Sequence, residues 1–103
     1  MSDLSQEQWA QQLKADENAF ILDVRTEEEV ADGFIPNAKN LNIFKGQAFI
    51  YELEALDKNK NYYVYCKAGV RSGQACVIMN QMGFDNAYNL MGGFSEWTGD
   101  IEE

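Results

Sequence analysis

The chain has 103 residues, of which 46% are hydrophobic and 13% aromatic, and this is enough to fill the core of one compact domain. Its 17 acidic residues outnumber the 8 basic ones, and the formal charge of -9 argues against nucleic acid or an anionic membrane surface as a partner. We therefore expect residues 1–103 to form a single folded domain that binds neither nucleic acid nor membrane.

The N-terminal region does not resemble an export signal. Residues 1–15 are polar and lack the basic start and apolar run of a signal peptide, and no segment approaches the roughly 20 apolar residues of a membrane span. A cytoplasmic location is the expectation, and there Cys66 and Cys76 are expected to be reduced rather than paired. Because the chain has no histidine, a zinc site would depend on carboxylates, and we expect no structural metal.

Helices and strands are predicted to alternate along the chain. Ser5 and Thr26 each precede a Gln or Glu by three residues, the capping-box spacing that begins a helix. Apolar periodicity and turn residues predict, in order, a helix over 6–15, a strand over 19–24, a short helix that begins after Thr26 and ends at Gly33, a strand over 40–43, a helix over 47–56, a strand over 62–65, a helix over 72–82, a strand over 87–90 and a short helix over 93–97. Strands separated by helices favour a parallel sheet with helices on both faces.

The segment most informative about function is Cys66-Lys67-Ala68-Gly69-Val70-Arg71-Ser72. It joins a predicted strand to a predicted helix, so the cysteine lies at the carboxyl end of a parallel strand, where such sheets bind ligands. Gly69 can adopt positive φ, and successive N–H groups of such a loop, with the positive end of the following helix, make an anion-binding concavity. Lys67 and Arg71 add two cations. These features lower a cysteine pKa, which predicts a nucleophilic thiolate at Cys66.

A structural role for Cys66 is the alternative from the residues alone, because a cysteine that ends a buried strand often serves as a small hydrophobic side chain. Glycine and two basic residues have no evident purpose around a packing cysteine, and this favours catalysis. Cys76 could be a resolving cysteine that forms a disulfide with Cys66. Its position next to Ala75 within a predicted helix favours packing instead.

Three further features are expected to be structural. Asp23, at the end of a predicted strand, is expected to accept backbone hydrogen bonds and hold a turn. Arg25 is expected to pair with a glutamate of the acidic run 27–29. Gly92-Gly93 lacks the rest of a nucleotide-binding fingerprint, so we interpret it as a tight turn that lets the following aromatic residues pack.

Four motifs occur in order along the chain: Ile21-Leu22-Asp23-Val24-Arg25, Gly33-Phe34-Ile35-Pro36-Asn37-Ala38, the Cys66 to Ser72 loop, and Gly92-Gly93-Phe94-Ser95-Glu96-Trp97. With these motifs the chain resembles the single-domain rhodanese-like sulfurtransferases over nearly its whole length. It departs from many of them at Phe34, where they have histidine, and at Asn37, where they have glycine. The resemblance implies a rhodanese-like three-layer α/β fold, with a parallel sheet of about four to five strands flanked by helices on both faces.

The resemblance also implies a chemistry. Cys66 would attack the sulfane sulfur of a small anionic donor such as thiosulfate, hold it as a covalent persulfide, and pass it to a thiol, to cyanide or to a sulfur-acceptor protein. Lys67 and Arg71 would bind and orient the donor. The N–H groups of the whole loop would stabilise the anion, so the predicted binding residues are Lys67, Ala68, Gly69, Val70, Arg71 and Ser72. No cofactor is expected besides the persulfide itself.

Two other functions remain open. Cys-dependent phosphatases that look like rhodaneses have five residues between cysteine and arginine, whereas residues 67–70 provide four here, and this disfavours a phosphatase. A non-enzymatic persulfide carrier or a redox-sensing binding domain fits the same residues.

Overall fold

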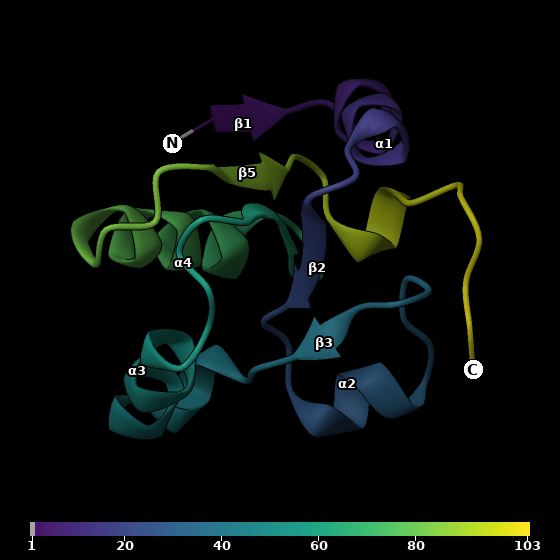
Figure 1. The fold of residues 1–103 in the computed structure, drawn as a ribbon. Helices are drawn as coiled ribbons and strands as arrows, with labels where there is room; N and C mark the ends of the chain where they lie inside the picture. Colours follow the sequence, from purple (N-terminus) through teal and green to yellow (C-terminus); the bar gives the residue numbers. More distant parts are fainter. Residues whose placement is uncertain (1) are drawn as a thin grey trace.

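The computed structural model describes residues 2–103 and contains a five-stranded parallel sheet in the order β1-β5-β4-β2-β3. Its strands are β1 (Ser2–Leu4), β2 (Ala19–Asp23), β3 (Lys39–Asn40), β4 (Asn61–Tyr65) and β5 (Ala87–Leu90). Its α-helices are α1 (Gln6–Ala15), α2 (Glu27–Ala31), α3 (Gln47–Glu54) and α4 (Val70–Gln81), and 3₁₀ helices cover Ile43–Lys45 and Phe94–Glu96. None of the helices within residues 2–103 is both long and apolar enough to cross a membrane. Helices lie on both faces of the sheet (Figure 1), which confirms the predicted three-layer α/β fold.

The sheet separates two hydrophobic layers, because neighbouring residues of a strand point to opposite faces. On β4, Tyr62 and Val64 belong to the layer formed with α3 and α4, whereas Tyr63 and Tyr65 belong to the layer that contains Trp9 of α1. All of these side chains are fully buried. Trp9 meets Tyr63 and Tyr65 edge-on, at ring-centroid distances of 5.7 and 6.3 Å. Packing on both faces therefore fixes β4 and the position of the residue that follows it.

Both predicted capping boxes are present. Ser5 Oγ accepts the N–H of Gln8 at 3.2 Å while the side chain of Gln8 accepts the N–H of Ser5, and α1 begins there. Thr26 and Glu29 form the same reciprocal pair at the start of α2. Glu29 is the third residue of the five-residue helix α2 and its side chain is part of this cap, so the cap fixes where its carboxylate lies.

A buried ion pair lies at the end of β2. Arg25 is 3% exposed and donates through Nη2 to Asp23 at 2.7 Å and to the carbonyl of Gly33 at 2.8 Å. Its guanidinium also lies 4.3 Å from the centre of the Phe94 ring. The prediction that Arg25 pairs with a glutamate of residues 27–29 is therefore wrong. Inside the protein its guanidinium contacts the carboxylate of Asp23 instead. Asp23 Oδ1 also accepts the N–H of Arg25 at 2.9 Å, which confirms its predicted turn-holding role.

Three differences from the sequence prediction bear on the sheet or on the cysteine loop, and the helix predicted over 47–56 also ends two residues early, at Glu54. The sequence pattern does not predict β1, whose three residues become a strand only by pairing with β5 at the edge of the sheet. The strand predicted over 40–43 shares only Asn40 with β3, because Asn42 accepts the N–H of Phe44 at 2.9 Å and turns the chain into a 3₁₀ helix. Finally, α4 begins at Val70 rather than at the predicted residue 72, which shortens the preceding loop.

Replacing Asp23 by alanine should destabilise the fold by about 3 kcal/mol, because the buried guanidinium of Arg25 then loses its counter-charge. Urea unfolding followed by tryptophan fluorescence measures this change. Glu27→Gln is the control, since it removes the exposed ion pair with Lys45 and keeps an amide oxygen that can accept from Asn42, and it is expected to leave the urea midpoint unchanged. A wild-type midpoint for Asp23→Ala would contradict the role assigned to the buried pair.

Candidate active site

Cys66 follows the last residue of β4 and begins a short loop that leads directly into α4. β4 ends at Tyr65, and α4 begins at Val70 with Gly69 as its N-cap. Gly69 has φ +100°, the left-handed conformation that the sequence predicts for it. The loop therefore brings the Cys66 sulfur to the N-terminus of a helix, where backbone N–H groups are not paired within the helix.

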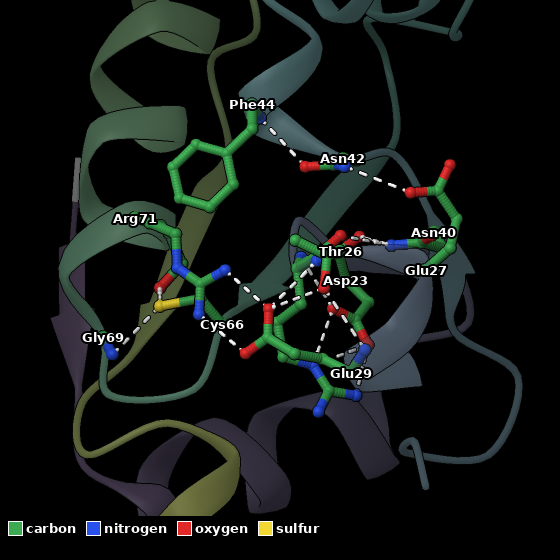
Figure 2. A network of polar contacts seen from close by, with 12 residues as sticks. Asp23, Thr26, Glu27, Glu29, Asn40, Asn42, Phe44, Cys66, Gly69 and Arg71 are labelled. Atoms are coloured by element: carbon green, nitrogen blue, oxygen red, sulfur yellow. Dashed lines mark hydrogen bonds and ion pairs between the residues drawn. The ribbon is translucent and has the colours of Figure 1, made fainter. Parts of the chain in front are cut away.

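The Cys66 sulfur is surrounded by hydrogen-bond donors (Figure 2). The N–H of Gly69 donates to Sγ at 3.0 Å, and the hydroxyl of Ser72 lies 3.3 Å from Sγ. Burial raises the pKa of this thiol, but the Ser72 hydroxyl and the N–H groups of Ser72, Gly69 and Ala68 lower it by more than burial raises it. The pKa of Cys66 is therefore below its ordinary value, so the thiolate forms more readily than in an unperturbed cysteine although the residue is only 1% exposed.

The Gly92-Gly93 turn holds the cysteine loop from the other side. The N–H of Phe94 donates to the carbonyl of Cys66 at 2.8 Å, and the N–H of Ser95 donates to the carbonyl of Lys67 at 3.0 Å. Gly93 has φ +61°, and a Cβ at this position would lie 2.5 Å from the carbonyl carbon and oxygen of Lys67. The tight turn is present as predicted, and its closest contact is with the cysteine loop, which the sequence alone does not reveal.

The two cations of the loop have different surroundings. Arg71 donates through Nη1 and Nη2 to the two carboxylate oxygens of Glu29, at 2.8 and 2.9 Å (Figure 2), and its guanidinium lies 5.3 Å from the centre of the Phe44 ring. Lys67 is exposed and makes no ion pair with any residue within 2–103. The sequence predicts that Arg71 binds a donor through two hydrogen bonds, but it already makes both of them to Glu29. The sequence suggests Arg25 instead as the partner of a glutamate in residues 27–29.

Ser72 is oriented by Asn89 of β5, a residue that no sequence motif singles out. The Ser72 hydroxyl lies 2.5 Å from Asn89 Oδ1, while Asn89 Nδ2 donates to the Gly69 carbonyl at 3.1 Å and to Asp3 Oδ1 at 2.9 Å. Because the amide nitrogen needs these two acceptors, the amide oxygen faces Ser72. Asn89 therefore holds the loop glycine and positions the Ser72 hydroxyl beside the sulfur; this hydroxyl has one proton, which it donates either to the amide oxygen or to the sulfur, but not to both at once. Its one sequence signal is that asparagine is uncommon inside a buried strand.

The remaining loop residues are exposed, whereas the second cysteine is buried. Ala68 and Val70 are exposed, with Val70 at 70%. Cys76 is fully buried in α4, and burial raises its pKa to about 12. Such a thiol is a poor nucleophile, and the burial agrees with the packing role expected for it.

Two surface hollows differ in their relation to the loop. The larger, a groove of about 1140 Å³ next to α1 and β2, is lined by residues outside the cysteine loop, among them Leu13, Ile21 and Trp97. The smaller, of about 210 Å³, is lined by Arg25, Glu29, Asp32, Lys67, Phe94 and Ser95. Only the smaller of these two hollows adjoins the chemistry of the loop.

The fold and the loop together define a class of protein, a parallel α/β domain that places a buried cysteine of lowered pKa, hydrogen-bonded to a loop N–H, at a helix N-terminus. Residues 6–100 match the family model described as the rhodanese-like domain, and the chain belongs to this family. This confirms the family resemblance drawn from the four sequence motifs.

Individual relatives agree with this assignment. The sulfurtransferase of Allochromatium vinosum is 31% identical over 97 residues, which cover 94% of this chain and 88% of that protein. The thiosulfate sulfurtransferase GlpE of Coxiella burnetii is 34% identical over 88 residues, covering 85% and 79%. The crystal structure of a rhodanese-like domain protein from Staphylococcus aureus has a TM-score of 0.84 at 34% identity and covers 99% of this chain and 97% of that one. The family thus assigns the chain a sulfurtransferase role in general terms.

Gly93→Ala should displace the Cys66 loop, because the added Cβ would meet the Lys67 carbonyl at 2.5 Å. Gly46→Ala is the matched control, since Gly46 has nearly the same φ, +58° against +61°, but nothing lies within 4 Å of an added Cβ. Both variants carry a backbone strain of about 1–3 kcal/mol, which urea unfolding reports. In folded protein only Gly93→Ala should also change the rate at which iodoacetamide alkylates Cys66. Equal alkylation rates in the two variants would show that the contact does not shape the loop.

Proposed function

We propose that this protein is a rhodanese-type sulfurtransferase that carries sulfane sulfur on Cys66 as a persulfide. The observation that carries the proposal is the Cys66 sulfur itself, which accepts the Gly69 N–H at 3.0 Å and has a lowered pKa. A thiolate and a persulfide are both anions centred on sulfur, so the same N–H donors favour both forms. The relatives named sulfurtransferase and thiosulfate sulfurtransferase support this chemistry.

The proposed reaction has two steps. First, the Cys66 thiolate attacks the outer sulfur of thiosulfate or of another sulfane donor and the S–S bond of the donor breaks. The leaving group takes the electron pair: sulfite from thiosulfate, a thiolate from an organic persulfide. Cys66 is then a persulfide anion. Second, a thiolate or cyanide attacks the outer sulfur of this persulfide, departs as a new persulfide or as thiocyanate, and returns Cys66 to the thiolate. Alternation between two covalent forms requires ping-pong kinetics.

The loop residues have distinct roles in this proposal. The N–H groups of Ala68, Gly69 and Ser72 stabilise the sulfur anion, and the exposed Lys67 attracts an anionic donor. The sulfur is held on Cys66, so the reaction requires no cofactor. The proposal places the protein in the cytoplasm, where a reducing environment keeps the thiolate available between turnovers.

Intact-mass measurement after treatment with a sulfane donor tests the proposal. Wild type should gain one sulfur, about 32 Da, and lose it again on addition of cyanide with release of thiocyanate. Cys66→Ser should gain nothing, whereas Cys76→Ala, which removes the other thiol, should gain and lose sulfur as wild type does.

Two results would contradict the proposal. If neither thiosulfate nor an organic donor adds sulfur to the wild type, a redox-sensing or binding role replaces the sulfurtransferase. If sulfur is added equally to Cys66→Ser, then Cys66 is not the carrier.

A further inference from the structure

The guanidinium next to the Cys66 loop is already occupied. Arg71 forms a two-point contact with Glu29, at 2.8 and 2.9 Å, and this is the geometry in which arginine binds a sulfonate or carboxylate. Both side chains are largely buried, with 19% of Arg71 and 26% of Glu29 exposed. The hydrogen bond from Arg71 lowers the pKa of Glu29 to about 2, against the effect of burial, so the carboxylate stays ionised at neutral pH.

Glu29 is also held in place by the start of α2. Its Oε1 accepts hydrogen bonds from the backbone N–H and from the hydroxyl of Thr26, both at 3.1 Å, and its own N–H donates to Thr26 Oγ1 at 3.2 Å. A donor that bound Arg71 through two points would have to break the ion pair and disturb the helix cap together. The geometry therefore opposes direct capture of the donor by Arg71.

The positive charge available to attract an anionic donor is therefore small. Arg71 and Glu29 cancel, and Lys67 remains as the exposed cation of the loop. In the first step a thiolate already carries one negative charge. Thiosulfate brings two more, whereas an organic persulfide or a thiosulfonate brings one, and repulsion grows in proportion to the charge of the donor.

The rim of the site offers apolar contact beside this weak charge. Phe44, against which the Arg71 guanidinium lies, is 68% exposed, and Val70 at the first position of α4 is 70% exposed. Thiosulfate has no apolar part to cover these side chains. An organic donor can cover them with its carbon skeleton and remove apolar surface from water.

We propose that Glu29 is a specificity-determining residue which, by holding Arg71, makes the site prefer a singly charged organic sulfane donor over dianionic thiosulfate. This inference rests on the persulfide chemistry proposed for Cys66. With an organic persulfide, the Cys66 thiolate attacks the outer sulfur, the S–S bond breaks, and a thiolate leaves with the electron pair. With a thiosulfonate the leaving group is a sulfinate. In both cases the charge balances and no external oxidant or reductant takes part.

The test compares two donors that differ by one charge, thiosulfate and methanethiosulfonate, with cyanide as the acceptor. Glu29→Gln keeps the capping box, which accepts glutamine, but removes the negative charge on Arg71. The ratio of kcat/KM for thiosulfate to that for methanethiosulfonate should rise about fivefold in Glu29→Gln, mainly through a lower KM for thiosulfate. Glu28→Gln removes the same charge from an exposed neighbour on the same helix and should leave the ratio unchanged.

A double variant distinguishes two cases: Glu29 neutralises Arg71, or Arg71 binds thiosulfate directly despite Glu29. Glu29→Gln with Arg71→Gln removes both charges of the pair, so the ratio should equal that of wild type. If the ratio falls, Arg71 binds thiosulfate despite Glu29, and the inference is overturned. It is also overturned if the ratio is unchanged in Glu29→Gln, or rises equally in Glu28→Gln. If no donor loads sulfur on wild-type Cys66, the proposed function fails first, and this outcome is recognisable because no ratio can then be formed.

Discussion

The hydrogen bond from the Gly69 N–H to the Cys66 sulfur is the contact on which the rest of the site depends. It forms because buried tyrosines fix β4 on both faces and because Gly69 takes a positive φ that begins α4. Gly93 closes the loop from the other side, at a distance that leaves no room for a side chain. A thiol that is 1% exposed would ordinarily ionise poorly, and the ring of donors reverses that tendency.

Pairing, rather than the net charge of -9, sets the electrostatics near the sulfur. Arg25 is buried against Asp23, and Arg71 is held by Glu29, so neither arginine acts as a free cation. Stabilisation of the sulfur anion therefore falls to backbone N–H groups, which serve a thiolate and a persulfide alike. Selection among sulfur donors is a separate property, and it depends on the side chains around the rim of the site.

The features that the sequence predicts are those encoded over a few neighbouring residues. Two capping boxes, the strand before Cys66 and the positive φ of Gly69 all follow from such local patterns. Two failed predictions depend on side chains only two residues away, Asp23 beside Arg25 and Asn42 before Phe44, which compete with the expected pairing and strand. The other features that the sequence does not predict depend on contacts between distant segments. Glu29 and Arg71 lie 42 positions apart, and Ser72 and Asn89 lie 17 apart. The strand β1 likewise exists because β5 pairs with it, whereas its own residues carry little strand pattern.

Titration of Cys66 in folded and unfolded protein tests the central claim most directly. In Cys76→Ala, which leaves Cys66 as the single thiol, the ultraviolet absorbance of the thiolate can be followed against pH with and without urea. In the unfolded chain Cys66 should titrate near the ordinary value of about 8.5. The account predicts that the folded protein titrates at lower pH, because the loop N–H groups and Ser72 outweigh burial. Titration of the folded protein at or above the unfolded value would contradict it.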